Sequence, residues 1–287
     1  MWTLDEFEVG QKLGEGGFGR VHLARRGRAV VVLKILRKAQ ISRHRAERKV
    51  ERELDIQSHL HHGNILALYA YFWDEHSIYM VLEHSHLGDL RKIVLATKHG
   101  GGAGGVGSAD AACYLRHTIS GLQHLHERDI IFRDLKSENL FLFHGKVVKL
   151  GDFGAAVHAP APDAHRRKTL IGTPVLYPPE MITADTYEKY VDLWALGLLA
   201  FELLFAEIPI KADTDDQFRT FRSILQLDAK KAIREQRKSR VNTEKPQEWF
   251  TSESDEAADD LIAKLLVQKP EKRLTLDDCA VHPFLKQ

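Results

Sequence analysis

The hydrophobic pattern of the chain changes near residue 83, and this change constrains the fold more than any other feature. Before it, five short segments are rich in Val, Leu, Ile and aromatic residues, as β-strands are. They span residues 7–13, 19–25, 29–36, 67–73 and 77–83. After it, apolar residues recur at helical spacing, and residues 191–205 are apolar nearly all round, as in a buried helix. We therefore expect an α+β fold with a small β-rich lobe (1–83), a connection at about 83–86 and a larger α-helical lobe (87–287).

Length and composition exclude several classes of protein. With 287 residues the chain can form one large domain or two lobes that share a cleft. Its 41 Lys and Arg residues balance 40 Asp and Glu residues, so no overall field favours nucleic acid or an acidic membrane surface. The N-terminus lacks an apolar signal segment, no apolar run approaches about 18 residues, and the two cysteines are far apart in the sequence. We expect a protein of the nucleus or cytoplasm that binds neither nucleic acid nor membranes.

One predicted helix, residues 47–62, places an acid on its apolar face. That face is formed by Val50, Leu54, Gln57 and Leu60. Glu53 lies in the middle of the face, and Lys34 ends the apolar strand VVVLK, where an unpaired ammonium group is costly to bury. The simplest arrangement pairs Lys34 with Glu53 and leaves Lys34 to hold nucleotide phosphates. A purely structural salt bridge is the alternative, but it leaves the neighbouring glycine-rich segment unexplained.

That segment, LGEGGFGRV at residues 13–21, has the pattern of a strand, a glycine-rich turn and a second strand. Gly14, Gly16 and Gly19 lack the Cβ atoms that would keep backbone N–H groups away from phosphate oxygens. The G-x-G-x-x-G pattern alone is weakly specific and also fits a tight hairpin. A dinucleotide-binding fold needs a helix next, whereas VHLARR is typical of a strand. The context therefore indicates a hairpin that covers a bound nucleotide.

Three further polar residues are candidates to act on a bound nucleotide. Asp134 and Asn139 lie in a loop within IIFRDLKSENLFLF, residues 130–143, and Asp152 follows a short strand in KLGDFG. Asn139 and Asp152 offer the hard oxygen ligands that Mg²⁺ prefers, with phosphate and water in its other positions. Asp134 then remains to orient an attacking hydroxyl group and accept its proton. Each of these residues, taken alone, also fits a solvated loop.

Together these motifs resemble the signature set of the protein kinases in order and spacing. The set comprises G-x-G-x-x-G-x-V, V-L-K, a helical Glu, R-D-L-K-x-x-N, D-F-G and P-P-E, and the resemblance covers residues 7–285. It implies the two-lobed protein-kinase fold, with ATP and Mg²⁺ in the cleft between the lobes. It extends to Asp192, Gly197 and Arg273, and in that family the last of these pairs with the P-P-E glutamate, here Glu180.

The resemblance also assigns roles to single residues. The adenine would bond to the backbone of Glu83 and Ser85, with Leu82 as gatekeeper. The implied catalytic residues are Lys34, Glu53, Asp134 and Lys136, and the implied metal ligands are Asn139 and Asp152. The implied ATP-binding residues are Leu13, Gly14, Glu15, Gly16, Gly17, Phe18, Gly19, Val21, Val32, Lys34, Leu82, Glu83, Ser85, Asp89, Glu138, Asn139, Leu142 and Asp152.

Longer segments resemble the Aurora kinases more closely than the related A, G and C group. They are KAQISRHRAERKVERELDIQSHLHHGNILALYAYF, DFGAAVHAP, RRKTLIGT and PPEM. In that family the threonine matching Thr169 is phosphorylated, and arginines matching Arg52, Arg133 and Arg167 clamp its phosphate. Such a dianion would tie the helix that carries Glu53 to the catalytic loop. The R-R-K-T sequence also resembles the basic substrate motif of these enzymes, which suggests autophosphorylation.

The family implies a function and partners. We expect a monomeric catalytic domain that phosphorylates Ser or Thr in arginine-containing protein sequences, acts in mitosis at the spindle or centromere, and binds an activator peptide on its small lobe. Lys136 favours Ser/Thr over Tyr specificity, and Glu138 and Asp89 are candidates to receive the substrate arginine. The alternatives are a kinase of the A, G and C group and a nucleotide-binding pseudokinase scaffold.

Three residues depart from the family pattern. Phe132 replaces a histidine that packs beneath the D-F-G phenylalanine, which keeps the packing and loses one hydrogen bond, worth roughly 1 kcal/mol. Ser137 replaces a proline, and Val32 replaces an alanine in the roof of the adenine pocket. The metal ligands, the catalytic base and the lysine are all present, so we expect a catalytically active site.

Two further segments have no assigned chemistry. Residues 100–107, GGGAGGVG, are too glycine-rich to fold on their own and predict a flexible surface loop. Residues 230–254 are highly charged, which is typical of a solvated helix and loop; a docking surface is the alternative.

Overall fold

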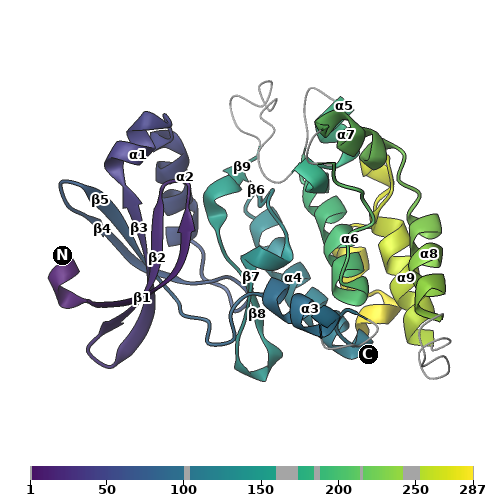
Figure 1. Ribbon diagram of the computed structural model, residues 1–287, viewed down its shortest axis with the longest axis horizontal. Coiled ribbons are helices and arrows are strands. Elements are labelled where there is room, and N and C mark those ends of the chain that lie inside the picture. Colours follow the sequence, from purple (N-terminus) through teal and green to yellow (C-terminus); the bar gives the residue numbers. More distant parts are fainter. Residues whose placement is uncertain are drawn as a thin grey trace.

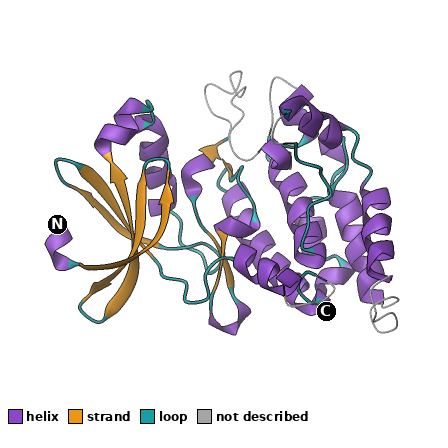
Figure 2. Ribbon diagram, viewed as in Figure 1, coloured by secondary structure: helices purple, strands orange, loops and turns teal. Residues whose placement is uncertain are grey.

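The computed structural model describes residues 2–99, 104–159, 174–183, 188–213, 216–241 and 253–286. Within these residues the chain forms two lobes joined by a narrow connection (Figure 1). Figure 2 shows the strands concentrated in the N-terminal lobe and the helices in the C-terminal lobe. The predicted two-lobed α+β fold is therefore confirmed.

The N-terminal lobe contains a five-stranded antiparallel sheet in the order β1-β2-β3-β5-β4. Its strands are β1 (Glu8–Gly16), β2 (Gly19–Arg26), β3 (Ala29–Arg37), β4 (Leu68–Trp73) and β5 (Ser77–Leu82). Successive side chains of a strand point to opposite faces, so in β3 Val31 and Leu33 join one apolar cluster and Val32 and Leu36 another. These five strands lie where the sequence pattern predicts them.

Two helices pack on the face of the sheet that carries Val32 and Leu36. The predicted helix is α2 (Glu47–Ser58), whose Val50 belongs to the same apolar cluster. The short helix α1 (Lys38–Arg43) precedes it and buries Ile41. The sequence pattern did not predict α1, because so short a helix cannot show a periodic apolar pattern.

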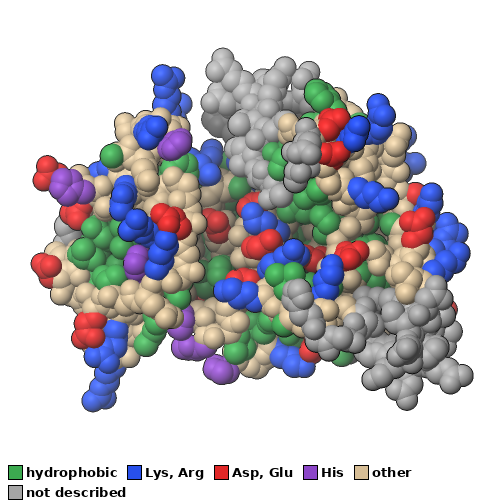
Figure 3. Space-filling model, viewed as in Figure 1, with side chains coloured by type: hydrophobic (Ala, Val, Ile, Leu, Met, Phe, Trp, Pro, Cys, Tyr) green, Lys and Arg blue, Asp and Glu red, His purple; other side chains and the backbone are tan. Residues whose placement is uncertain are grey.

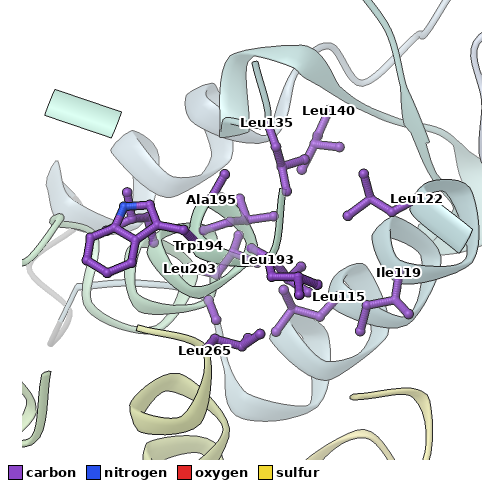
Figure 4. Packing of buried hydrophobic residues seen from close by; sticks show 14 of the residues in the cluster. Leu115, Ile119, Leu122, Leu135, Leu140, Leu193, Trp194, Ala195, Leu203 and Leu265 are labelled. Carbon is purple, nitrogen blue, oxygen red and sulfur yellow. The ribbon is translucent and has the colours of Figure 1, made fainter. Parts of the chain in front are cut away.

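The C-terminal lobe is built around one apolar core of helices. Its helices are α3 (Leu90–His99), α4 (Ser108–His126), α5 (Pro179–Thr183), α6 (Tyr190–Phe205), α7 (Gln217–Leu225), α8 (Ala229–Val241), α9 (Glu253–Leu265) and α10 (Leu276–Ala280). Figure 4 shows Leu115 and Ile119 of α4 close to Leu193 of α6 in this core. Every residue of α6 from Val191 to Phe205 is buried, as its apolar sequence predicts.

Two short antiparallel ribbons lie on the side of the large lobe that faces the sheet (Figure 1). In one, β6 (Ile130–Ile131) pairs with β9 (Val157–His158), and in the other β7 (Leu140–Leu142) pairs with β8 (Val148–Leu150). One-turn helices follow the loop at Ser137–Asn139 (η2) and at Phe153–Ala155 (η4). The ribbons thus hold the two segments that carry Asp134, Asn139 and Asp152.

The two segments without assigned chemistry are partly packed. Residues 100–103 and 242–252 lie outside the described residues. The N–H of Val106 donates to the carbonyl of Leu203 at 2.7 Å, so the end of the glycine-rich segment lies against α6 rather than forming a free loop. In the charged segment, α8 buries Ile233 and pairs Arg237 with Asp259 of α9 at 2.7 Å. In the described part of the chain, no helix combines the length and apolar character needed to cross a membrane.

Candidate active site

Lys34 joins the two lobes electrostatically. It lies in β3, where it pairs across the strands with Val21 of β2, and its Nζ is 2.6 Å from Glu53 Oε1 of α2. The same Nζ is 3.3 Å from Asp152 Oδ1 in the C-terminal lobe. Glu53 is buried on an apolar helix face and therefore needs a cationic partner, which Lys34 provides. The predicted Lys34–Glu53 ion pair is present.

Lys34 and Asp152 each stabilise the charged form of the other. Burial alone lowers the pKa of Lys34, but the carboxylates of Glu53 and Asp152 raise it above its usual value, so the amine stays protonated. The charge of Lys34 lowers the pKa of Asp152 against the opposing effect of burial, and the N–H of Gly154 adds to this. Asp152 is therefore an ionised carboxylate, half exposed to solvent, that can bind a cation.

A second polar group surrounds Asp134. Lys136 Nζ donates to Asp134 Oδ2 at 2.8 Å. The amide nitrogen of Asn139 donates to the carbonyl of Asp134 at 2.8 Å and to its Oδ2 at 2.9 Å. These bonds fix the rotamer of Asp134 and use the donor end of the Asn139 amide, which leaves its oxygen as an acceptor.

The β7–β8 ribbon brings Asn139 and Asp152 to one end. Asn139 immediately precedes β7 and Asp152 follows β8, and the carbonyl of Asn139 accepts a hydrogen bond from the N–H of Gly151 at 2.9 Å. An amide oxygen and an ionised carboxylate are hard ligands that fit Mg²⁺. Among the described residues, no group of three or more His, Cys, Asp or Glu side chains forms a metal site alone. The donor set therefore suits an ion that also takes ligands from a bound phosphate.

Asp192 anchors the loop that carries Asp134. Its carboxylate is fully buried at the start of α6 and accepts hydrogen bonds from the N–H groups of Phe132 (3.0 Å) and Arg133 (2.8 Å). His126 Nε2 lies 2.8 Å from the same carboxylate. Arg133 (φ 68°) and Asp152 (φ 59°) both have left-handed backbone conformations. Such strained conformations persist only where surrounding contacts hold them, which is common at active sites.

The ring of Phe132 packs on the D-F-G phenylalanine, as the sequence predicts. The Phe132 and Phe153 ring centroids are 5.3 Å apart at 71°, an edge-to-face contact. Both side chains are fully buried. The backbone bond from Phe132 to Asp192 holds the loop without a contribution from the side chain.

The glycines of the β1–β2 turn differ in what they contact. An added Cβ would meet nothing within 4 Å at Gly14, Gly16 or Gly17. At Gly19 it would lie 1.8 Å from the carbonyl oxygen of Ile35 in β3. Gly19 is thus required by the pairing of β2 with β3, a reason that the sequence motif did not reveal. The open space at the others is consistent with room for a ligand.

The segment that joins the lobes places the predicted adenine contacts together. Val32 of β3 lies opposite Leu82 of β5, and both belong to one apolar cluster. Ser85 Oγ donates to the carbonyl of Leu142 at 2.5 Å, which fixes this segment to β7. The N–H of Glu83 donates to the carbonyl of Ala67 at 2.9 Å and its side chain pairs with Lys149 at 2.6 Å.

Of the predicted phosphate clamp, two arginines are described. Arg52 lies on α2, and Arg133 donates from Nε to the carbonyl of Ala155 at 2.6 Å. Arg167 and Thr169 lie outside the described residues. The predicted pair of Arg273 with Glu180 is present, with two bonds of 2.7 Å between buried side chains.

Each of the two predicted substrate acids lies beside a cation of the chain itself. Asp89 pairs with Lys92 of α3 at 3.1 Å, whereas Glu138 of η2 lies 3.8 Å from Arg91. Sequence reasoning missed the partner that links Arg91 and η2, which is Glu202 of α6. The one available signal was Ser137, a hydroxyl where the sequence resemblance leads us to expect a proline.

Known proteins resemble this chain along its whole length. A family model for the protein kinase domain matches residues 7–285. Aurora kinase C of Mus musculus is 37% identical over 288 residues, with 100% of this chain and 94% of that protein covered. Serine/threonine-protein kinase Aurora-1 of Arabidopsis thaliana is 36% identical, with 100% and 88% covered. An Aurora kinase of Patiria pectinifera is 36% identical, and there the chain spans 64% of the relative's length.

Proposed function

Because the chain belongs to the Aurora family of protein serine/threonine kinases, we propose that it transfers the γ-phosphoryl group of ATP to Ser or Thr in arginine-containing protein sequences. The observation that supports this most is the position of Lys34 Nζ, 2.6 Å from Glu53 and 3.3 Å from Asp152. A cation shared by two carboxylates from different lobes is expensive to bury without a use. Its place between β3 and the D-F-G segment fits a contact with nucleotide phosphates.

The nucleotide would be held by both lobes. Lys34 contacts its phosphates, and the β1–β2 turn covers them. The adenine lies between Val32 and Leu142, and the backbone of Glu83 and Ser85 bonds to its edge. Asn139 and Asp152 would hold Mg²⁺, which neutralises the developing charge on the phosphates when bound.

The transfer itself relies on position and charge. Asp134 accepts a hydrogen bond from the Ser or Thr hydroxyl, orients it for in-line attack on the γ-phosphorus and takes up its proton, while the bond between the γ-phosphorus and the departing ADP breaks. Lys136, 2.8 Å from Asp134, is placed to stabilise the transferred phosphoryl group. Asn139 holds Asp134 in its rotamer through the two bonds from its amide nitrogen.

Activation would depend on phosphorylation of Thr169. Its R-R-K-T context is basic, and a phosphate there would carry a charge of about −2 and three acceptor oxygens. Three arginines would supply guanidinium groups for it: Arg52 on α2, Arg133 on the loop that carries Asp134, and Arg167, two positions before Thr169 in the sequence. Pairing the phosphate with all three would hold α2, and hence Glu53, against the C-terminal lobe.

An activator peptide would bind to the small lobe beside α2. Tyr71 and Trp73 of the edge strand β4 are 44% and 57% exposed, and their rings stack with centroids 6.4 Å apart. They lie opposite Met80 and Ile78 of β5, which pack on the α2 side of the sheet. Exposed aromatic residues at a sheet edge suit recognition of an apolar peptide segment. By family, the setting is mitotic, at the spindle or centromere, in a protein of the nucleus and cytoplasm.

Phosphoryl transfer is tested with the purified chain, Mg²⁺, radiolabelled ATP and a serine peptide that contains arginine. We expect label in the peptide, and intact-mass analysis followed by peptide mapping should find phosphate on Thr169. The Asp152→Asn variant should lose transfer while it keeps the fold. The matched control is Asp277→Asn, an exposed aspartate on α10, which should remain active. A folded wild-type chain that binds nucleotide without any transfer would be a pseudokinase, and the proposal would fail.

A further inference from the structure

A cluster of charges links α3, η2 and α6 beside the proposed catalytic loop. Arg91 Nη1 donates to Glu202 Oε1 at 2.5 Å, and Arg91 Nε lies 3.8 Å from Glu138 Oε1. Ser137 Oγ lies 3.0 Å from Glu202 and 3.4 Å from Glu138, and its single proton goes to the closer carboxylate. The cluster is thus two carboxylates, one guanidinium group and one hydroxyl group.

The cluster lies next to the site of phosphoryl transfer. Ser137 directly follows Lys136, whose Nζ bonds to Asp134. In Figure 3 the surface is hollowed between the lobes, and acidic and basic side chains alternate across the adjoining part of the large lobe, where α3 and β7 lie. A peptide with its hydroxyl at Asp134 would therefore have its neighbouring residues close to Glu138.

The members of the cluster differ in how freely they can exchange partners. Ser137 is fully buried, and the side chain of Glu202 is 8% exposed. Burial raises the pKa of Glu202, and the bonds from Ser137 and Arg91 only partly oppose this. The side chains of Arg91 and Glu138 are 38% and 51% exposed. A buried carboxylate needs a cationic partner, but the exposed guanidinium group can be displaced by another one.

We propose that Arg91 determines substrate specificity. Its guanidinium group, which belongs to the enzyme itself, occupies the place where a substrate arginine would pair with Glu138 and Glu202. This inference rests on the proposed function. A guanidinium group binds carboxylates through a planar fork of donors, so a substrate arginine needs the same oxygen atoms that Arg91 uses. Lys92 weakens the other candidate acid in the same way, because it pairs with Asp89 at 3.1 Å. The enzyme should thus prefer arginine-containing peptides only weakly, and Arg91 sets that preference.

The test compares two serine peptides that differ only in arginine or its neutral isostere citrulline upstream of the serine. The measured quantity is the ratio of kcat/KM for the two peptides. Replacing Arg91→Met should raise this ratio about tenfold, the change expected for one gained charge-assisted hydrogen bond. The matched control is Lys98→Met, which removes a cation from the same helix where it pairs with Glu207, and it should leave the ratio unchanged.

Two further variants keep the test decisive. If Arg91→Met unfolds, Arg91→Gln retains a hydrogen-bond donor without the charge and should raise the ratio in the same direction. The double variant Arg91→Met/Glu202→Gln should lose the gain, because it removes the buried carboxylate. An unchanged ratio in the Arg91 variants, or an equal rise in Lys98→Met, overturns the inference while transfer itself continues. Absence of transfer to either peptide in the folded wild type overturns the proposed function as well.

Discussion

At the scale of single residues, the catalytic loop is held by its backbone and by packing more than by the side chain at position 132. Asp192 accepts hydrogen bonds from the N–H groups of Phe132 and Arg133, and these bonds do not depend on the Phe132 ring. The ring fills space beneath Phe153. The phenylalanine at this position, where the resemblance leads us to expect a histidine, therefore preserves the support of the D-F-G segment.

We predict that Phe132→Ala lowers the free energy of unfolding by about 3–5 kcal/mol, because it leaves a cavity under Phe153. Chemical denaturation at equilibrium measures the change. Phe132→Leu keeps most of the apolar volume and should cost clearly less. Equal stability of the alanine variant and the wild type would contradict the packing role.

The ionisation of Asp152 gives a prediction on pH. Lys34 lowers the pKa of Asp152, so Mg²⁺-dependent nucleotide binding should persist as pH falls below the usual range of a carboxyl group. In Lys34→Met the largest effect that opposes burial is lost and only weaker ones, such as the charge of Lys136, remain, so the pKa of Asp152 should rise and the Mg²⁺-dependent part of binding should be lost at higher pH. Calorimetric titrations across pH measure this, with Lys34→Arg as the charge-retaining control. Coincident pH profiles of Lys34→Met and the wild type would show that Lys34 does not control Asp152.

At the scale of secondary-structure elements, the β1–β2 hairpin combines two requirements in one glycine motif. Gly19 lies where β2 pairs with β3, and its added Cβ would meet backbone atoms of Ile35, which cannot turn away. Gly17 at the tip has open space. One motif therefore contains a glycine needed for the sheet and glycines that leave room for a ligand.

We predict that Gly19→Ala destabilises the protein by about 1–3 kcal/mol, the usual cost of overpacking, and raises the KM for ATP as the hairpin shifts. Gly17→Ala should leave the stability nearly unchanged. Thermal unfolding of the two variants without nucleotide makes the comparison. A stable Gly19→Ala variant would mean that the hairpin separates from β3 at little cost.

At the scale of the whole molecule, the lobes meet through the 83–86 segment, through the Lys34–Asp152 contact and through backbone bonds such as that from the N–H of Leu66 to the carbonyl of Leu150 at 2.8 Å. ATP would add contacts with both lobes, and a ligand that binds only the native state stabilises it by mass action. At about 100 times the dissociation constant this amounts to about 2.7 kcal/mol.

We therefore predict that ATP with Mg²⁺ raises the melting temperature, and that chelation of Mg²⁺ removes part of the rise. In Asp152→Asn the Mg²⁺-dependent part should be absent, whereas the effect of ATP alone should remain. Differential scanning calorimetry with and without a chelator separates the two parts. A full Mg²⁺-dependent rise in this variant would contradict the assignment of Asp152 as a ligand.

The sequence by itself determined the secondary-structure elements and the local motifs, because both depend on residues that lie close together in the chain. Short segments rich in Val, Leu, Ile and aromatic residues predicted the strands of the sheet, and a helical stripe predicted α2 with Glu53 on it. A lysine at the end of an apolar strand and an acid on an apolar face each required a partner, so their pairing was also predictable. The short helix α1 was not predicted, because its 6 residues span less than two helical turns, too few to show a periodic apolar pattern.

Tertiary structure alone decided which distant side chains complete the site. Glu202 meets Arg91 and Ser137 across three separate elements, Asp192 fixes the catalytic loop from within α6, and Gly19 is required by a carbonyl of the next strand. No local pattern encodes these contacts, since each depends on how buried elements pack against one another. The charge balance beside the proposed peptide site is therefore a property of the fold rather than of any single motif.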